Sequence, residues 1–288
     1  MKKYLALMRV KHYIKNLLIF FPALLTLQLR NAAVVWTVAV GFALFCFAAS
    51  IVYIVNDILD VEADRAHPLK CGRPLASGAV SLCSAWMLVA TLAGAELILW
   101  GLAGFDVRCI LWPAVYLALN IFYSICLKRI PLLDVLILVS DYVLRLWYGA
   151  ILAGTIVSNW MFLTVMSAAF FMGFGKRRNE FLKYGVSMRE SLKGYTEKFL
   201  DKAMQITLTS SIVFYSLMCA DVNTEVARAG VNMLWTTPFI IVICLRYLML
   251  VEKESSDGDP VSVIMGDRTL ILLCFGYIMA VGVSLYFR

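Results

Sequence analysis

The apolar and polar positions divide the chain into long hydrophobic runs separated by short polar segments. Each run is long enough to cross about 30 Å of hydrocarbon as an α-helix. We therefore predict an all-α polytopic membrane protein with about nine transmembrane helices. The runs lie at residues 17–36, 38–56, 80–103, 107–125, 132–153, 159–175, 203–221, 231–250 and 268–287.

The composition supports this class. Of the 288 residues, 62% are hydrophobic and 16% are charged, which is too apolar for a soluble globular protein. The first run is too long, and too closely followed by the second, to be a cleaved signal peptide, so we expect it to remain in the mature protein. The eight cysteines show no C-x-x-C spacing and are predicted to be packing residues. We predict one membrane domain over residues 1–288.

Basic residues indicate how the chain is oriented. If the N-terminus is cytoplasmic, 21 of the 26 Lys and Arg residues lie on the cytoplasmic side, as the positive-inside rule requires. The net charge of +7 is then explained by topology and by anionic lipid, and we expect no nucleic-acid partner. The predicted cytoplasmic loops are residues 57–79, 126–131, 176–202 and 251–267.

A row of carboxylates follows the second apolar run. Asp57, Asp60 and Asp64 are spaced i, i+3, i+7, so they share one face if the helix continues past the membrane edge. A hard cation would relieve their repulsion, and Mg²⁺ is typically bound by a few carboxylates together with substrate phosphates. We predict a Mg²⁺ site here, with Asn56 beside it. A solvated helix end is the simpler alternative.

The next segment is predicted to fold back over these carboxylates. His67-Pro68 and Arg73-Pro74 end the helix and begin a loop. Lys70 and Arg73 are then free to contact an anion.

A basic cluster opens the loop after the sixth run. Lys176, Arg177 and Arg178 stand beside Glu180. Such a cluster commonly acts only as a topology signal at the membrane edge. Opposite a row of carboxylates, it is better interpreted as a phosphate-binding cluster with one additional acidic group.

Ionisable residues also lie within the fifth run. Asp134, Asp141 and Arg145 share a helix face, and charged groups in a membrane are expected to face a polar cavity and to pair. Asp141 and Arg145 are close enough in sequence to neutralise each other. Asp134 is therefore the better functional candidate, together with Tyr123 and Lys128 at the end of the fourth run.

Polar residues also stand at two further places, before the first run and before the last. Lys15 and Asn16 precede the first run, where basic residues attract anionic lipids in general or, more specifically, the phosphate of a substrate lipid. Asp259-Pro260 is typical of the start of a helix.

The acidic segment resembles the first aspartate-rich motif of the UbiA superfamily of intramembrane prenyltransferases. This resemblance implies a UbiA-type helical bundle with its active site on the cytoplasmic side, in the inner (plasma) membrane of a prokaryote. The residues that carry it are Asn56, Asp57, Asp60 and Asp64, then His67-Pro68, Lys70, Arg73-Pro74 and Ser77-Gly78.

The loop after the sixth run departs from the usual superfamily pattern. A second D-x-x-x-D-type motif is expected there, and Lys176-Arg177 with Glu180 stand in its place. With this departure the chain resembles the decaprenyl-phosphate phosphoribosyltransferase branch. That implies transfer of 5-phosphoribose from phosphoribosyl diphosphate (PRPP) to a polyprenyl phosphate, with release of diphosphate. Two phosphorylated substrates require more cationic groups and fewer carboxylates than one prenyl diphosphate.

The resemblance also implies roles for individual residues. Mg²⁺ would be held by Asp57, Asp60 and Asp64 and would stabilise the leaving diphosphate. Asp134 would hold a ribose hydroxyl, and Lys15 with Asn16 would hold the lipid phosphate. The remaining candidates are Arg65, Lys70, Arg73 and Lys128 for the phosphates of PRPP, and Asn56, Tyr123, Lys176, Arg177 and Glu180 for the substrate-facing walls.

Two other functions remain open from the sequence. The first is a UbiA-type transferase that joins a prenyl group from prenyl diphosphate to an aromatic or quinone precursor. The second is a transporter or lipid-binding scaffold, although such a protein would place polar residues at mid-membrane in several helices. A homo-oligomer is compatible with the sequence as well.

Overall fold

The computed structural model describes residues 2–66, 70–187, 189–253, 256 and 258–286, and over these residues its regular elements are all helices. Seven of its helical segments are long and apolar enough to cross a membrane. The predicted all-α, multi-span class is therefore confirmed. The seven are α3 (Ala32–Leu59), α5 (Leu82–Leu102), α6 (Arg108–Ile125), α7 (Leu133–Ala153), α9 (Glu197–Ala220), Leu234–Val251, which contains α11 (Thr237–Val251), and α13 (Arg268–Tyr286).

Helix α8 (Asn159–Tyr184) is longer than its apolar run predicts. Its first turn is capped by Ser158, whose side chain accepts a hydrogen bond from the backbone of Met161. Its last turns carry the basic cluster, and Arg177 and Asn179 are buried there. The helix can continue beyond the apolar run because other parts of the protein cover its charged end.

The prediction of one helix over residues 17–36 is wrong. Leu27 adopts a left-handed backbone conformation with φ of 60°, which interrupts the helical path. Asn31 then accepts a hydrogen bond from the backbone of Ala33 and so caps α3, which begins inside the run assigned to the first span. In place of one helix, the chain forms the 3₁₀ helix η1 (Val10–Phe20), α2 (Phe21–Leu25) and the 3₁₀ helix η2 (Gln28–Arg30).

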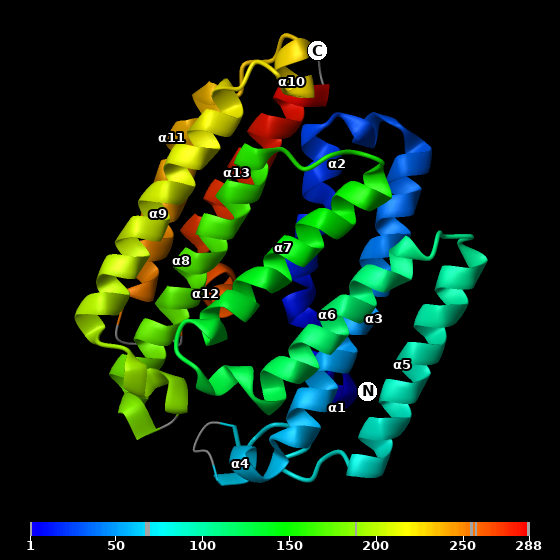
Figure 1. Cartoon of the computed structure of the whole chain (residues 1–288), viewed down its shortest axis with the longest axis vertical. Helices are drawn as coiled ribbons and strands as arrows, with labels where there is room; N and C mark the ends of the chain where they lie inside the picture. The colour runs from blue at the N-terminus through cyan, green and yellow to red at the C-terminus, as the bar shows by residue number, and fades with distance from the viewer. Residues whose placement is uncertain (1, 67–69, 188, 254–255, 257, 287–288) are drawn as a thin grey trace.

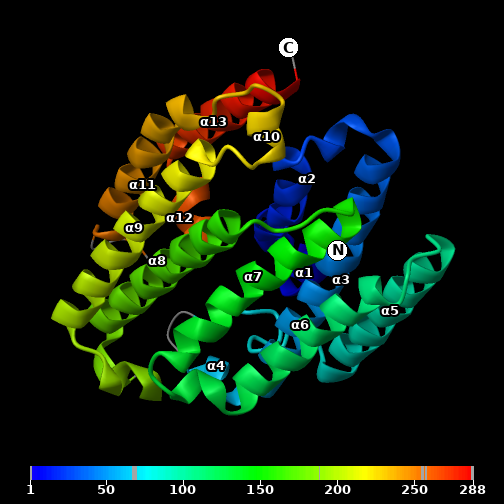
Figure 2. The same cartoon turned by 45° about the horizontal axis from the view of Figure 1, so that its top comes forward.

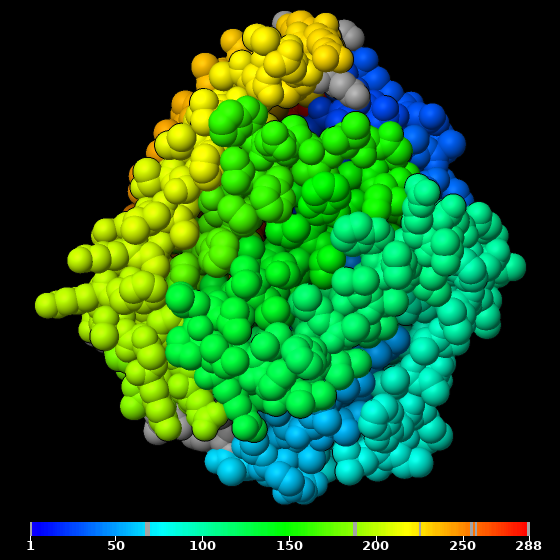
Figure 3. All heavy atoms as spheres, viewed as in Figure 1, coloured from blue at the N-terminus to red at the C-terminus, as the bar shows by residue number. Residues whose placement is uncertain are grey.

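The long helices form two groups on either side of α7, which runs obliquely between them (Figure 1). One group contains α8, α9, α11 and α13, and the other contains α3, α5 and α6. Within these groups, α8 packs against α9, and α3 packs against α5 and α6. The same grouping is visible in the tilted view (Figure 2). In the space-filling view, α7 and α8 fill the centre of this face, between α9 and α5 (Figure 3).

The backbones of η1 and α7 come unusually close at Gly149. A Cβ atom at this position would lie 2.1 Å from the carbonyl oxygen of Ile19, so only glycine fits. This contact fixes η1 directly against α7. The remaining short elements are α1 (Lys2–Leu7), α4 (Val61–Ala66), η3 (Leu127–Arg129), η4 (Gly185–Ser187), η5 (Glu190–Gly194), α10 (Glu225–Arg228), η6 (Leu234–Thr236) and α12 (Pro260–Gly266).

Candidate active site

Several ion pairs of charged side chains lie at one end of the bundle. This is the end at which α4 lies (Figure 1). The end of α3, the end of α6, the start of α7 and the end of α8 meet here. Asn56 on α3 accepts a hydrogen bond from Ser124 on α6, and Lys128 after α6 pairs with Asp60 after α3. Segments that are far apart in sequence are thus joined by polar contacts at this end.

The acidic cluster, defined as Asp57, Asp60 and Asp64, does not form one uniform row. Helix α3 ends at Leu59 and α4 begins at Val61, so Asp60 lies at the junction of the two helices. Asp57 and Asp64 are both 3% exposed. The side chain of Asp60 is 37% exposed and turns towards Lys128 at 2.7 Å. The three carboxylates that were predicted to share one face therefore differ in burial, and Asp60 is the most exposed one.

Two carboxylates of this cluster converge on one guanidinium group. Nη1 of Arg73 lies 3.2 Å from Asp57 and 2.6 Å from Asp64. Arg9 lies 2.6 Å from the same oxygen of Asp57 and also covers the ring of Tyr53. The loop after α4 thus folds back over the carboxylates as predicted. Arg9 stands among other basic residues before the first run, and its position in the sequence does not by itself predict this contact.

The donor set of the acidic cluster fits a hard divalent cation. Within the described residues, no three His, Cys, Asp or Glu side chains are grouped closely enough to hold a metal by themselves. However, Asp57 and Asp64 already share one positive group, and their oxygens are the ligand type that Mg²⁺ prefers. A site completed by substrate phosphates needs only a few protein carboxylates. These two residues, with Asp60 beside them, are the ones that could hold the ion.

Lys70 and Arg65 differ in their surroundings. Burial lowers the pKa of Lys70, Arg73 lowers it further, and Asp64 and Glu180 oppose the shift. Lys70 is thus influenced by groups on both α4 and α8. Arg65 is half exposed and pairs with Glu62 at 2.7 Å, so the structure does not bring it to the site. His67 and Pro68 lie outside the described residues.

The predicted basic cluster at the end of α8 is divided between two environments. Arg177 is 1% exposed and its Nε lies 2.6 Å from Asp134, which is fully buried. This contact is an ion pair rather than a well-directed hydrogen bond, because that Nε has no hydrogen-bond partner. Arg177 also pairs with Glu180 and donates to the hydroxyl of Tyr123 at 3.3 Å. Arg178 points elsewhere, to Asp201.

Asp134 has both of its carboxylate oxygens engaged. Ser191 donates to one oxygen at 3.0 Å, and Arg177 lies beside that same oxygen. Tyr195 donates to the other oxygen at 2.7 Å. The expected contact between Asp134 and a ribose hydroxyl is not supported by this arrangement. Instead, Asp134 positions Arg177.

Arg189 is a site residue that the sequence did not reveal. It donates to the hydroxyl of Tyr123 and, at 3.1 Å, to the backbone oxygen of Lys128, and it lies 3.9 Å from Glu180. It therefore links the end of α6 with the end of α8. Its segment, between α8 and α9, carries several basic residues, and nothing in their spacing distinguishes Arg189 from the others.

Lys15 and Lys176 lie on either side of one carboxylate. They are 3.7 Å and 3.8 Å from the same oxygen of Asp259, which also caps α12. Burial works against ionisation of Asp259, but Lys15 and Lys176 outweigh it and lower its pKa. The predicted helix start at Asp259-Pro260 is confirmed. The same residue also brings two cationic groups together.

Lys15 lines an apolar cavity of about 550 Å³. The cavity lies between η1, α2, α8, α12 and α13, and its other lining residues are almost all apolar. One cationic group in an otherwise apolar cavity suits a ligand with an anionic head and a hydrocarbon chain. Representative lining residues are Leu18, Phe21, Leu24, Met172, Ile264 and Ile278.

Asn16 faces away from this cavity despite its position next to Lys15. It is 1% exposed, accepts a hydrogen bond from Arg145 at 2.8 Å and donates to the sulfur of Cys46. Its predicted contact with a lipid phosphate is therefore not supported. Arg145 donates to the backbone oxygen of Asp141, and the carboxylate of Asp141 accepts from Asn120. The polar groups of this intramembrane network bond to one another.

Comparison with known proteins defines the class. The model of the UbiA prenyltransferase family matches residues 17–285. The chain therefore belongs to the UbiA prenyltransferase family and is a membrane transferase. A UbiA homologue from Archaeoglobus fulgidus bound to GPP and Mg²⁺ has the same fold, with a TM-score of 0.71 at 17% sequence identity over 97% of this chain and 99% of that one.

Two relatives narrow the comparison within the family. The decaprenyl-phosphate phosphoribosyltransferase of Corynebacterium glutamicum is 32% identical over 287 residues, which cover 97% of this chain and 85% of that protein. The enzyme of the same name from Mycolicibacterium smegmatis is 32% identical over 294 residues, which cover 97% of this chain and 91% of that protein.

Proposed function

We propose that this protein transfers 5-phosphoribose from PRPP to a polyprenyl phosphate and releases diphosphate, in a reaction that depends on Mg²⁺. The observation that carries the proposal is the number of cationic groups in contact with the acidic cluster. Arg9 and Arg73 contact Asp57, and Lys128 contacts Asp60. Three cationic side chains at one cluster suit two phosphorylated substrates, because they can bind phosphate oxygens once a cation occupies the carboxylates. The names of the relatives agree with it.

Asp57 and Asp64, with Asp60 beside them, would hold Mg²⁺, whose charge stabilises a leaving diphosphate when the ion is bound. Arg9 and Arg73 are 25% and 29% exposed, so both can exchange a carboxylate partner for a phosphate oxygen. Lys128 and Arg189 contribute further positive charge where α6 ends, on the side facing α8. In this proposal, these basic residues bind and orient the phosphates of PRPP.

The acceptor lipid is proposed to occupy the apolar cavity that Lys15 lines. Its phosphate would lie between Lys15 and Lys176, whose ammonium groups Asp259 holds near each other. The hydrocarbon chain would follow η1, α2 and α13 through the apolar lining. Burial of such a chain favours binding by about 0.8 kcal/mol for each CH₂ group.

The chemistry needs little proton transfer. A phosphate oxygen of the lipid attacks C1 of the ribose, and the bond from C1 to the diphosphate breaks, so diphosphate leaves with the electron pair. The lipid phosphate is already ionised at neutral pH and requires no strong general base. The protein accordingly contributes alignment of the two reactants and stabilisation of charge.

The direct test uses purified protein in detergent with Mg²⁺ and two substrate pairs. One reaction contains radiolabelled PRPP and polyprenyl phosphate, and the other contains radiolabelled prenyl diphosphate and an aromatic acid. We expect label to enter a phosphoribosyl lipid in the first reaction only. EDTA should stop the transfer and excess Mg²⁺ should restore it. A prenylated aromatic product in the second reaction, with no product in the first, would refute the proposal.

We further propose that this end of the bundle faces the cytoplasm of a prokaryotic cell, because PRPP is water-soluble and the loops here are rich in Lys and Arg. A cysteine-accessibility assay can check this orientation. An added cysteine in the 185–194 segment should react with an impermeant maleimide only after the inner membrane has been opened.

A further inference from the structure

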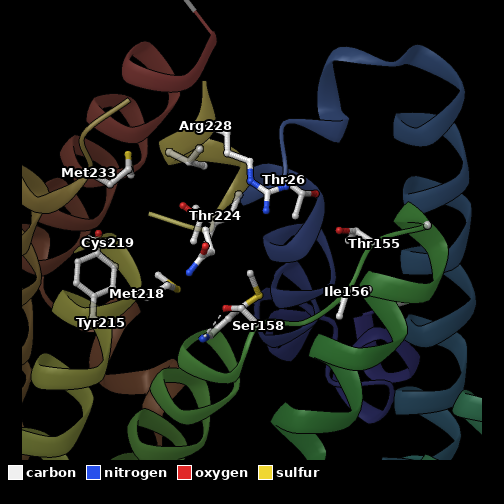
Figure 4. A pocket seen from close by; sticks show the side chains of 15 residues that line it. Thr26, Thr155, Ile156, Ser158, Tyr215, Met218, Cys219, Thr224, Arg228 and Met233 are labelled. Carbon is white, nitrogen blue, oxygen red and sulfur yellow. Dashed lines mark hydrogen bonds between the residues drawn. The ribbon is translucent and has the colours of Figure 1, made fainter. Parts of the chain in front are cut away.

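A second cavity lies at the opposite end of the bundle from the acidic cluster, near α10 (Figures 1 and 4). Its volume is about 360 Å³, within the range of small-ligand sites. It is enclosed by the end of α2, the turn from α7 to α8, the end of α9 and α10. The apolar part of its lining includes Leu25, Met161, Met218, Val226 and Met233.

The mouth of this cavity carries one cationic group. Figure 4 shows the guanidinium of Arg228 directed across the opening towards Thr26. Among the described side chains, none forms an ion pair or hydrogen bond with the guanidinium of Arg228. The residues that line the cavity include no Asp or Glu. An arginine on a cavity lining that contains no Asp or Glu favours an anionic ligand.

Hydrogen-bond donors point to the same ligand class. The Ser158 oxygen accepts a hydrogen bond from the backbone of Met161, so its own hydrogen remains free to donate. Thr155, in the turn before α8, is another lining residue with a hydroxyl group. The 26-residue helix α8 also begins here, and the positive end of its dipole favours negative charge.

Two other hydroxyl groups act differently. Thr26 donates to the backbone oxygen of Pro22, and Thr224 donates to that of Asp221. Both therefore present only an oxygen acceptor to the cavity. Such acceptors can bind hydroxyl groups of a ligand, while the nearby cationic donor binds its phosphate. This combination suits a phosphate ester whose alcohol portion carries hydroxyl groups.

We propose that this cavity binds the head of an anionic phosphate amphiphile. The phosphate lies beside Arg228, Ser158 and the start of α8, and the apolar portion contacts the apolar lining, which includes Met161, Met218 and Met233. The source of such a ligand is a phospholipid, with free phosphate as the alternative source of the same chemistry. The proposal does not depend on phosphoribosyl transfer, because the two sites lie at opposite ends of the bundle.

Ligand binding to purified protein in an uncharged detergent tests the proposal. Native mass spectrometry and thermal unfolding would be measured with dioctanoyl phosphatidylglycerol, dioctanoyl phosphatidylcholine and inorganic phosphate. We expect phosphatidylglycerol to bind and to raise the unfolding temperature more than the zwitterionic lipid does. Arg228→Gln should weaken that binding roughly tenfold, as the loss of one charge-assisted contact implies.

The matched control is Arg108→Gln. Arg108 lies at the same end of the bundle, and its side chain is 76% exposed with only a weak pair to Asp106 at 4.0 Å. This variant should bind phosphatidylglycerol as the unmodified protein does. Thr155→Trp fills part of the cavity and should also abolish binding.

The outcomes separate the two ligand sources. In one outcome, inorganic phosphate raises the unfolding temperature as much as phosphatidylglycerol does. If Arg228→Gln also removes that rise, the site is assigned to a free anion. Equal affinity for phosphatidylglycerol in Arg228→Gln, Arg108→Gln and the unmodified protein would overturn the proposal.

Discussion

Two groups of ion pairs face each other at the charged end of the bundle, and they differ in burial. In the acidic cluster, the Asp57 side chain is 3% exposed, while its partners Arg9 and Arg73 are 25% and 29% exposed. At the end of α8, Arg177 and Asp134 are 1% and 0% exposed. The first group can exchange partners when a ligand arrives, whereas the second is fixed. We infer that the first group performs the chemistry and that the second holds the opposite wall in place.

The largest expected effect is on the acidic cluster. Asp57→Asn should lower turnover by about 10³-fold or more, since it removes a ligand for the cation that stabilises the leaving group. The purified variant should still unfold cooperatively on heating. Glu62→Gln is the control, because its side chain is 80% exposed, and it should retain activity within about twofold. Normal turnover in Asp57→Asn would remove the metal site from the mechanism.

The second prediction concerns the fixed pair. Arg177→Gln leaves the carboxylate of Asp134 buried without its charge partner, so it should destabilise the protein by about 3 kcal/mol or more. Thermal unfolding in detergent measures this loss. Adding Asp134→Asn should recover part of it, because the buried group is then neutral. Arg178→Gln, which removes a partly exposed pair with Asp201, should cost far less.

The third prediction separates binding from turnover at the lipid cavity. Lys15→Gln should raise the KM for polyprenyl phosphate roughly tenfold and leave the KM for PRPP nearly unchanged. Lys176→Gln should act in the same direction. Lys11→Gln, at an exposed position in the same segment, should leave both constants unchanged. A change confined to the KM for PRPP would place Lys15 with the other substrate.

The smallest effect is predicted for Arg65, which the sequence grouped with Arg73. Arg65→Gln should change activity by less than about twofold, because the exposed pair with Glu62 contributes little. Arg73→Gln should be severely impaired, since Arg73 contacts both Asp57 and Asp64. Steady-state kinetics of the two variants at saturating Mg²⁺ would show this difference. Equal impairment would place Arg65 within the site.

The sequence predicted the elements of the fold well where hydrophobic runs were long and clearly bounded. It failed at residues 17–36, because apolar content does not reveal the break at Leu27 or the cap at Asn31. Hydrophobicity measures whether a segment is apolar, but a left-handed residue inside an apolar segment leaves that measure unchanged. The end of α8 was also missed, since the helix continues to Tyr184 beyond its apolar run. Ion pairs with other parts of the protein neutralise the charged residues of these last turns, and hydrophobicity does not reveal such contacts.

The acidic cluster was accessible from sequence because its members lie within one short segment. Arg73 was found for the same reason, since a turn after α4 brings it back over Asp57 and Asp64. Arg189 was not found, because its place beside Tyr123 depends on how three distant segments pack. Asn16 was assigned to the lipid on the basis of its neighbour Lys15. In the 3₁₀ helix η1, however, adjacent side chains point in different directions, and Asn16 faces Arg145.

The close approach of η1 to α7 at Gly149 has a consequence for substrate alignment. Lys15 lies on η1, and the first turn of α7 contains Asp134, which pairs with Arg177. The carbonyl oxygen of Ile19 on η1 occupies the place that a side chain at position 149 on α7 would need. Any larger residue there would push η1 outwards and shift the anchored lipid head relative to the sugar donor. In the proposed reaction, the absence of a single methyl group at position 149 would thus set the spacing between lipid phosphate and PRPP.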